Sequence, residues 1–396
     1  MKKQMKKRTM KMFAVLLSVI MILSGLTGCS TDKEKDKQET QKVTETVTKQ
    51  PEPTKEDVTT ENQITPTEAE PAPTDEESDP TVEPTQEVVV ENENEEYTPV
   101  KIDNYERTIE FSEKPDGIVV LTLNSAEIVA ALGEAESIKG IAQNNNVVKD
   151  VLPDLYPLLS KCDFPAEINS GIPTLEGMLG LSPKLVIANS YYFRVPQIFG
   201  SLEDYQANGV EFYITEGSYV PDCTIENTYN DIRNIGAILN KQDEAEKIIT
   251  DMKQRMENVS KKVADQTPVS VMSFDSFDED GFTVSGGTGL VQNLISLAGG
   301  NNAFADAEGQ FVSVNIEEII TRNPDVIVIH AYTAMGDEDT QAKIDKLKNT
   351  PELSEVNAIK NDNIIVVPLF QVNPGLQNVN YVESLAAVMY PELFEN

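Results

Sequence analysis

Seven short apolar runs, spread over the last 296 residues of the chain, restrict the possible folds more than any other feature. Each run holds four to six residues, which is the length of a buried strand. Segments with helical periodicity, such as residues 125–132 and 174–181, separate the runs. Strands that alternate with helices favour parallel sheets covered by helices on both faces. The expected strands are residues 117–121, 138–142, 185–188, 210–214, 269–274, 326–329 and 364–367.

One expected helix is much longer than the others. Residues 243–264 contain neither Pro nor Gly, and apolar residues such as Ile249, Met252 and Met256 recur there every three or four positions. At 1.5 Å per residue this helix spans roughly 30 Å, about the width of a small domain. A folded region of almost 300 residues exceeds what one compact core usually holds, so we expect two lobes joined by this helix. The expected division is an N-terminal lobe over residues 101–241, a connecting helix over 242–266 and a C-terminal lobe over 267–396.

The first 29 residues have the order of a secretory signal. Six basic residues precede an apolar run over 12–23, and Leu26-Thr27-Gly28-Cys29 follows. The run is shorter than the roughly 20 residues of a transmembrane helix, so we expect the signal to be removed. The tetrapeptide resembles a bacterial lipobox, in which Cys29 carries two acyl chains, enough for a stable anchor on the outer face of a membrane. An ordinary cleaved signal with a chance Cys is the alternative.

Residues 30–100 differ in composition from the rest of the chain. They are rich in Thr, Glu, Pro, Gln and Lys, with 21 acidic and six basic side chains. Such a segment buries too little apolar surface to fold, and Pro and like charges keep it extended. We expect a disordered tether, of the kind that a Gram-positive cell wall requires. The net charge of the whole chain, −34, argues against nucleic acid and anionic lipid as partners.

Cysteine and histidine are scarce. Cys162 and Cys223 match no metal or redox spacing, and a disulfide or two free thiols are equally compatible with the sequence. His330 is the only histidine, which argues against a zinc or copper cage and leaves one candidate for a catalytic triad. A surface hydrolase is a disfavoured alternative, because the chain has no Gly-x-Ser-x-Gly elbow and no phosphate-cradling glycine loop.

A short pattern occurs once in each expected lobe. Glu176 and Glu317 each lie seven residues before a proline that leads into an expected strand. Proline ends the short helix that each Glu begins, and an acid in the first turn of a helix is favoured by the macrodipole. Helix stabilisation therefore explains either Glu alone. As a matched pair they also suit contacts with a two-fold partner.

These features resemble the helical-backbone class of ABC-importer solute-binding proteins, which takes up ferric siderophores, haem and cobalamin. The resemblance covers residues 105–396. It implies an α/β fold of two Rossmann-like lobes joined by one long backbone helix, with the ligand cleft between the lobes. It also implies that Glu176 and Glu317 pair with arginines of the two permease subunits, that the chain is not an enzyme, and that it acts as a monomer. The segments that carry it are Leu175-Glu176 with 183–188, Ile316-Glu317 with 324–329, the long helix, 118–121 with 127–133, 294–300 and 390–394.

Ligands of α/β lobes lie beyond the carboxyl ends of the strands. Aromatic residues are concentrated in the segments that follow the expected strands, and they suit a large, flat or partly apolar ligand, although ordinary core aromatics would look the same. Arg194 is the only cation there, so neutral hydroxamate complexes of iron, or cobalamin, fit better than a tris-catecholate. His330 or a Tyr suits haem iron, and a structural His is the alternative. The expected ligand-binding residues are Tyr191, Tyr192, Arg194, Tyr219, Phe277, His330, Tyr332 and Phe370.

The favoured function is therefore a lipid-anchored binding component that delivers an iron complex, of the ferric siderophore type, to an ABC permease dimer with its ATPase. A cobalamin or haem binder of the same class is the nearest alternative. A sensor or adhesion lipoprotein that kept the fold without the transporter is a third. No resident cofactor is expected in any of them.

Overall fold

The computed structural model describes residues 97–279 and 281–394. The expected signal, Cys29 and residues 30–96 of the expected tether lie outside this part of the chain. Tyr97 already belongs to the folded part, because its hydroxyl donates to the carbonyl of Ile238 at 3.1 Å, and β1 begins at Val100. Among the described helices none combines the length and apolar character needed to cross a membrane.

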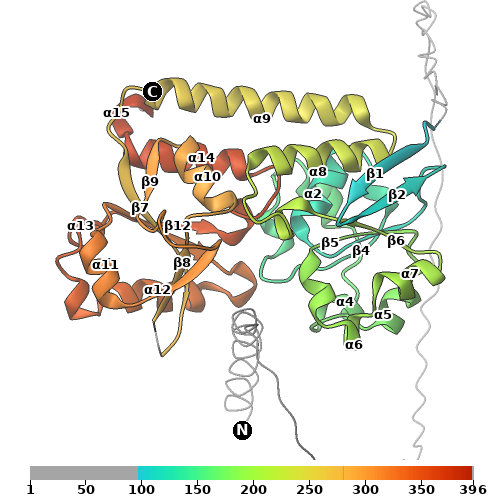
Figure 1. The fold of residues 1–396 in the computed structure, drawn as a ribbon, viewed down its shortest axis with the longest axis horizontal. Helices are drawn as coiled ribbons and strands as arrows, with labels where there is room; N and C mark the ends of the chain where they lie inside the picture. The colour runs from blue at the N-terminus through green and yellow to red at the C-terminus, as the bar shows by residue number, and fades with distance from the viewer. Residues whose placement is uncertain (1–96, 280, 395–396) are drawn as a thin grey trace, which may run out of the picture. The chain divides into compact units, whose positions relative to one another are not determined.

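The N-terminal lobe is built on four parallel strands in the order β4-β3-β5-β6. All residues of β3 and β5, the two central strands, are buried, as expected for strands covered on both faces. Helices α2 (Leu123–Ala131) and α8 (Ile225–Ile238) cover one face, and shorter helices cover the other (Figure 1). The strands are β3 (Ile118–Val120), β4 (Ile138–Ile141), β5 (Leu185–Ala188) and β6 (Glu211–Ile214). The shorter helices are α4 (Ala166–Asn169), α5 (Leu175–Gly180), α6 (Pro196–Phe199) and α7 (Leu202–Ala207).

The C-terminal lobe has a mixed sheet in the order β10-β8-β7-β11-β12, with β9 beside the first residues of β7. Strands β7, β11 and β12 are parallel, whereas β8 and β10 run antiparallel to their neighbours. The strands are β7 (Val269–Phe277), β8 (Phe282–Ser285), β9 (Gly300–Asn302), β10 (Phe311–Val314), β11 (Val326–Ala331) and β12 (Ile364–Pro368). Helices of this lobe include α10 (Leu290–Leu297), α11 (Ile316–Arg322), α12 (Asp337–Lys348) and α14 (Asn378–Met389).

Seven of these strands coincide with the predicted runs, and the α/β prediction is confirmed. The sequence did not predict β8, β9, β10 or the hairpin of β1 (Val100–Asn104) and β2 (Arg107–Phe111). These strands mix polar with apolar residues: β1, β9 and β10 are partly exposed, and β8 carries Thr283 and Ser285 although it is mostly buried. They therefore lack the continuous apolar run that marks a doubly covered strand.

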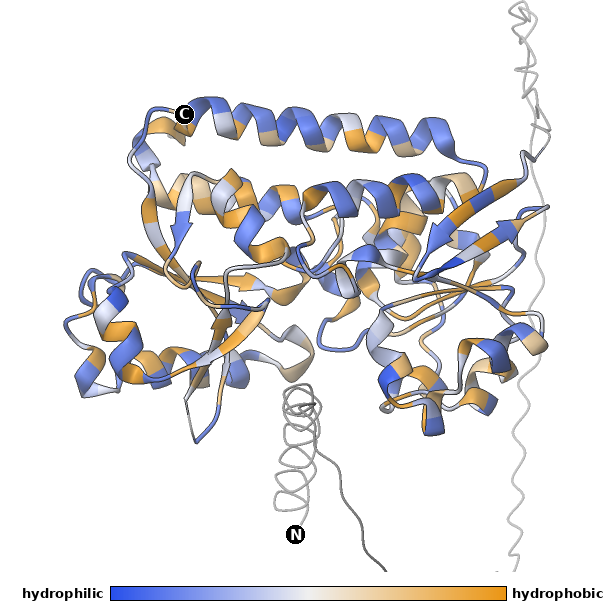
Figure 2. Ribbon diagram, viewed as in Figure 1, coloured by the Kyte–Doolittle hydropathy of each residue, from blue (hydrophilic) through white to orange (hydrophobic). Residues whose placement is uncertain are grey.

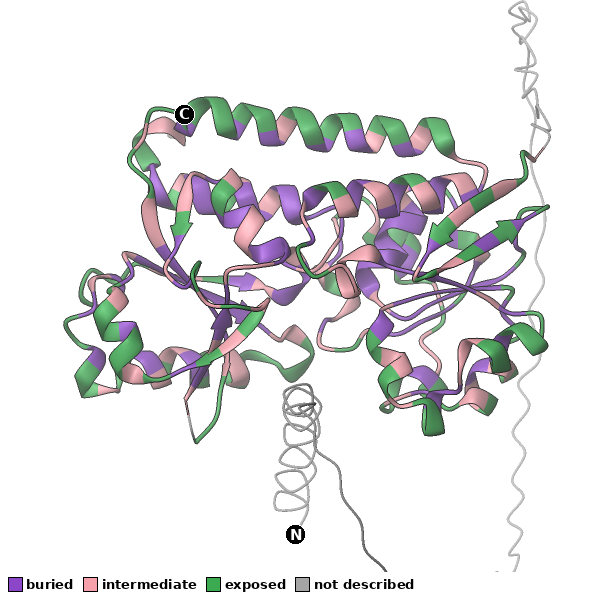
Figure 3. Ribbon diagram, viewed as in Figure 1, coloured by how far each residue is buried: buried purple, intermediate pink, exposed green. Residues whose placement is uncertain are grey.

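Helix α9 (Gln242–Val263) lies between the two sheets in the chain and runs along α8 and α14. Its inner face carries Ile249, Met252 and Met256, all buried, while its outer face is hydrophilic and exposed (Figures 2 and 3). This amphipathic pattern is the one that the sequence predicted.

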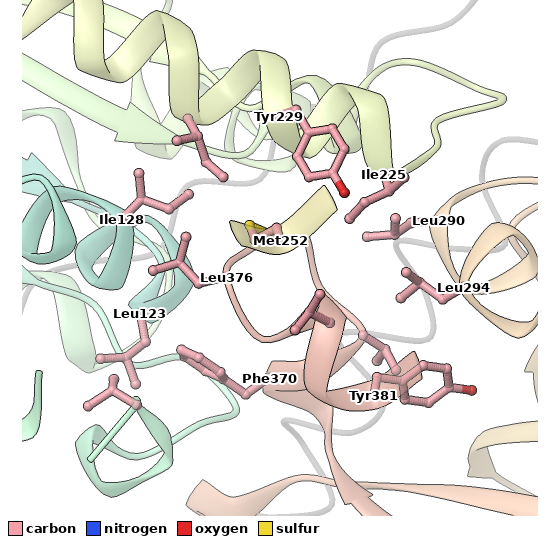
Figure 4. Close-up of a cluster of buried hydrophobic side chains, with 14 of the residues drawn as sticks. Leu123, Ile128, Ile225, Tyr229, Met252, Leu290, Leu294, Phe370, Leu376 and Tyr381 are labelled. Carbon is pink, nitrogen blue, oxygen red and sulfur yellow. The ribbon is translucent and has the colours of Figure 1, made fainter. Parts of the chain in front are cut away.

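One apolar cluster continues from lobe to lobe beneath α9 (Figure 4). Leu123 and Ile128 of the N-terminal lobe, Met252 of α9, and Leu294 and Tyr381 of the C-terminal lobe all belong to it. The two lobes therefore share a core instead of meeting at a polar interface.

Replacement of Met252 by Ala should lower the free energy of unfolding by about 2–5 kcal/mol, because it leaves a cavity in the shared core. Urea denaturation measures the change. Gln254→Ala on the exposed face of the same helix is the control and should stay within about 0.5 kcal/mol of the wild type. Equal effects of the two variants would contradict the shared core.

Candidate functional site

A narrow cleft lies where the carboxyl ends of the N-terminal strands face the C-terminal lobe. Its cavity volume is about 80 Å³. The N-terminal lobe contributes Thr122, Asn124, Ser125, Asn189, Tyr191, Thr215, Gly217, Ser218 and Cys223. The C-terminal lobe contributes Thr288, Leu290, Val291, Gln310, Phe311, Val372, Asn373 and Pro374. Both lobes thus build one site, as the fold prediction requires.

The lining of this cleft is uncharged. Hydroxyl and carboxamide side chains from both lobes lie there beside apolar ones such as Leu290 and Val291, and no Asp, Glu, Lys, Arg or His is among the described residues that line it. The hydroxyl and carboxamide groups donate and accept hydrogen bonds without offering a counter-charge. Tyr191 and Phe311 add exposed aromatic surface, one from each lobe.

Tyr191 is the predicted ligand residue that lines the cleft. Its side chain is 44% exposed, and the Arg194 guanidinium lies 4.7 Å above its ring, a cation–π contact. Tyr192 does not line the cleft. Its hydroxyl donates to the Leu121 carbonyl and to Asn144 Oδ1, both at 3.2 Å. Burial raises the pKa of Tyr192 to about 12. The Tyr219 ring packs edge-on against Tyr105 at 5.2 Å.

The predicted residues of the C-terminal lobe lie outside the cleft lining. Phe277 is exposed at the end of β7, 5.6 Å from the Lys346 ammonium. Phe370 is fully buried in the shared core near Leu123 and Leu376 (Figure 4). The segments chosen from the strand ends do contribute to the cleft, but through small polar residues such as Asn124 and Asn373 instead of aromatics.

The cleft residues of the C-terminal lobe that the sequence did not predict include several beside strands that it also did not predict. Gln310 and Phe311 lie at the start of β10, and Thr288 lies before α10. Because β8 and β10 are antiparallel and were not predicted, no strand-end argument could reach these residues. Val372 and Asn373 differ, since they lie in the segment after β12 that the strand-end rule selected.

His330 is fully buried in a polar network inside the C-terminal lobe. Its Nε2 lies 2.7 Å from Ser273 Oγ and its Nδ1 lies 3.3 Å from Asp275 Oδ1, while Tyr332 donates to Asp275 Oδ2 at 2.7 Å. Burial alone would raise the pKa of Asp275, but the hydrogen bonds from His330 and Tyr332 outweigh it and lower the pKa. Lys343 closes the network by donating to the His330 carbonyl at 2.7 Å.

This arrangement places a Ser, a His and an Asp in the order of a hydrolytic triad. Ser273 and His330 are both 0% exposed, so no substrate reaches them in this structure. The fold brings Ser273 to His330 from 57 residues away. The burial of Ser273 and His330 is what rules out a hydrolytic triad, and His330 does not line the cleft.

Asp231 does not line the cleft itself but holds a turn that does. Its Oδ1 accepts from the Tyr213 hydroxyl at 2.7 Å and from the Glu216 amide at 2.9 Å, which fixes the turn that presents Gly217 and Ser218. Burial raises the pKa of Asp231 to about 8. Its Oδ2 has no hydrogen-bond partner among the described residues, as suits a protonated acid.

Cys162 and Cys223 are free thiols, so the open question of a disulfide between them is answered for this structure. Cys223 lines the cleft, and burial raises the pKa of its thiol. Within residues 97–279 and 281–394, no group of His, Cys, Asp or Glu is placed to hold a metal ion.

Glu176 and Glu317 are exposed in the first turns of α5 and α11. In α11 the cap is formed by its neighbour: Glu318 accepts from the Asn315 amide at 2.8 Å and Asn315 Oδ1 accepts from the Glu318 amide at 3.0 Å. Neither Glu176 nor Glu317 forms an ion pair within the described residues. Both helices lie on the side of the sheets away from α9 (Figure 1).

A family model for periplasmic binding proteins matches residues 118–369. The chain belongs to this family. An uncharacterised ABC transporter substrate-binding lipoprotein of Bacillus subtilis (strain 168), YvrC, is 24% identical over 305 residues, 76% of this chain and 88% of that protein. A vitamin B12-binding protein of Photorhabdus laumondii is 28% identical over 216 residues, 54% of this chain and 70% of that protein.

The same fold occurs in solved structures. A crystal structure of an ABC-type Fe³⁺-hydroxamate transport system from Saccharomonospora viridis matches with a TM-score of 0.60 and 20% identity, over 74% of this chain and 99% of that chain. The chain is thus a periplasmic binding protein and not an enzyme, and the relatives it matches are named as ABC transporter substrate-binding and vitamin B12-binding proteins. Its class works outside the cytoplasm with a small-molecule ligand and a permease and ATPase as partners.

Replacement of Asp231 by Asn should flatten the pH dependence of stability. In the wild type the unfolded chain ionises this group near pH 4 and the folded chain near pH 8, so stability is full below pH 4 and falls as the pH rises to 8. At about 1.4 kcal/mol per pKa unit, the loss attributable to Asp231 is on the order of a few kcal/mol. Urea denaturation at pH 5 and pH 8 measures it.

Asn keeps the acceptor for Tyr213 and Glu216, so the variant should lose less stability than the wild type between these two pH values. Burial raises the pKa of Glu127 to about 7, so Glu127 also contributes to the fall of stability with pH. Glu127→Gln removes that contribution and measures it separately. Identical slopes in the wild type and in Asp231→Asn would show that Asp231 does not titrate as described.

Proposed function

We propose that this periplasmic binding protein captures a neutral ferric hydroxamate complex and delivers it to an ABC permease. The observation that carries the proposal is the uncharged lining of the cleft, with hydroxyl and carboxamide groups from both lobes. Three hydroxamates neutralise one ferric ion, whereas a tris-catecholate complex keeps several negative charges. A buried charge without a partner is costly, so this lining favours the neutral complex.

Cobalamin is the second candidate, because a relative over 216 residues is a vitamin B12-binding protein. The amide groups of a corrinoid would pair with the same carboxamides of the cleft. Haem is less well supported, since its propionates find no cation among the described lining residues and His330 is buried away from the cleft.

The lipid on Cys29 and the tether are part of the same proposal, although both precede the described residues. The lipoprotein name of YvrC supports them. Anchoring the binding protein to the membrane that holds the permease raises its effective concentration there, so weak docking suffices.

Glu176 and Glu317 are the proposed contacts to the two permease subunits. Each is an exposed carboxylate at a helix start, and no ion pair within the described residues competes for it. Charge-assisted pairs with arginine would orient the docking more than they strengthen it.

Ligand identity is testable by thermal shift with ferrichrome, cyanocobalamin, haemin and a ferric tris-catecholate. At a ligand concentration 100 times the Kd, binding should stabilise the fold by about 2.7 kcal/mol. We expect the shift with ferrichrome, and a shift with cyanocobalamin alone would transfer the assignment to the second candidate. A shift with only the tris-catecholate, or with none, would refute a neutral ligand of this class.

Charge reversal at both docking residues, Glu176→Lys with Glu317→Lys, should abolish uptake and leave ligand affinity in solution unchanged. The matched control is Asp251→Lys with Glu257→Lys on the outer face of α9, which changes the net charge equally. Uptake is followed with the radiolabelled ligand in cells. Normal uptake by the docking variant would contradict the docking role of Glu176 and Glu317, whereas no uptake by the wild type would favour the sensor or adhesion alternative.

A further inference from the structure

Two short segments of the N-terminal lobe supply much of its share of the cleft lining. They are residues 189–191, which follow β5, and residues 215–218, which follow β6, and we call them the paired segments. Strands β5 and β6 are adjacent and parallel, so both segments leave the same edge of the sheet. The lining residues that they contribute are Asn189, Tyr191, Thr215, Gly217 and Ser218.

Hydrogen bonds join the paired segments to each other. The Ser190 amide donates to Ser218 Oγ at 2.8 Å, and Ser190 Oγ donates to the Ser218 carbonyl at 2.6 Å. The Thr215 hydroxyl donates to Asn189 Oδ1 at 2.8 Å. Ser218 Oγ donates in turn to the Thr215 carbonyl at 2.7 Å. Because of these bonds, a displacement of one segment is passed to the other.

One buried carboxyl group holds the second of the paired segments in place. Asp231 of α8 is 1% exposed, and its Oδ1 accepts from the Glu216 amide at 2.9 Å. The same oxygen accepts from the Tyr213 hydroxyl at 2.7 Å, and that hydroxyl accepts from Asn234 Nδ2 at 3.1 Å. Tyr213 is fully buried in β6. Asp231 therefore ties the turn to the rigid interior of the lobe.

No positive charge compensates Asp231. The titratable groups that face it are Tyr213 of β6, Glu216 of the turn, and Tyr219 and Cys223 of the segment that follows. No basic side chain in the described part of the chain is among the groups that shift its pKa. Arg233 of the same helix pairs instead with Glu246 of α9. Asp231 Oδ2 is buried and has no hydrogen-bond partner among residues 97–279 and 281–394.

Ionisation of Asp231 would strain the turn. Burial raises the pKa of Asp231 to about 8, although the hydrogen bonds from the Glu216 amide and Tyr213 act against it. The Glu216 carboxylate adds to the rise, and Asn227 Nδ2 and Asn230 Nδ2 hold its Oε2 beside α8 at 2.7 Å and 3.2 Å. A buried charge without a cation, near a like charge, is costly. Movement of the turn that lets solvent reach Oδ2 would lower that cost.

We propose that Asp231 is a positioning residue of the binding site: in its protonated form it holds the paired segments where they line the cleft, and its ionisation loosens them. Affinity for ligand then falls as the pH rises. The proposal rests on the proposed function in that the ligand binds in this cleft. It adds a form of regulation to that site, because ligand is held more tightly in acidic than in alkaline surroundings.

Calorimetry with ferrichrome and with cyanocobalamin, at pH 6 and at pH 9, tests the effect on binding. About a tenth of wild-type molecules keep the Asp231 proton at pH 9, so affinity should be about tenfold lower there than at pH 6. Asp231→Asn cannot ionise and should bind equally well at both pH values. Glu127→Gln, which removes another buried acid with a raised pKa, is the matched control and should keep the tenfold fall.

A second measurement needs no ligand. The Ser190 amide donates to Ser218 and not to Asp231, so its NMR signal reports whether ionisation is passed on to the first of the paired segments. In the wild type labelled with ¹⁵N-serine, this signal should shift with a midpoint at about pH 8, and Glu127→Gln should behave in the same way. In Asp231→Asn that midpoint should be absent.

A Ser190 signal that does not titrate in the wild type would overturn the proposal, and so would a fall in affinity that persists in Asp231→Asn. Equal wild-type affinity at both pH values would overturn it as well, and that measurement does not depend on the folding of any variant. Absence of heat with both probes at pH 6 counts against the proposed function. The Ser190 titration then decides the positioning role of Asp231 separately.

Discussion

The apolar core shared by the two lobes is the constraint on which the rest of the structure depends. Side chains of α2, α8, α9, α10 and α14 fill one continuous space, so neither lobe completes its own packing alone. Rotating the lobes apart at α9 would expose that surface at about 25 cal/mol per Å². The packing beneath α9 therefore resists relative motion of the two lobes.

Much of this architecture follows from sequence pattern. The strands covered on both faces have continuous apolar runs, and α9 has a clear helical period, so both could be predicted. The antiparallel strands β8 and β10 could not, because each mixes Thr or Ser with apolar residues and so carries no continuous apolar run. Local periodicity carries no information about their antiparallel pairing.

The candidate site was harder to predict than the fold. The rule that ligands lie beyond strand ends selected several segments that line the cleft, but of the aromatic residues chosen within them only Tyr191 lines it, while Phe370 is buried in the core. An aromatic side chain of a loop is long enough to reach the core, and the sequence does not indicate whether it points into the core or into the cleft. His330 shows the same limit, because its partners Ser273 and Asp275 come from a neighbouring strand.

At the start of α11 two adjacent acids differ in what they contact. Glu318 exchanges hydrogen bonds with Asn315 and so holds the helix start together, and Glu317 takes no part in that exchange. A carboxylate that its own helix does not need can be engaged or released by another molecule at no cost to the fold. Gain or loss of a partner at Glu317 would therefore leave the hydrogen bonds that begin α11 intact.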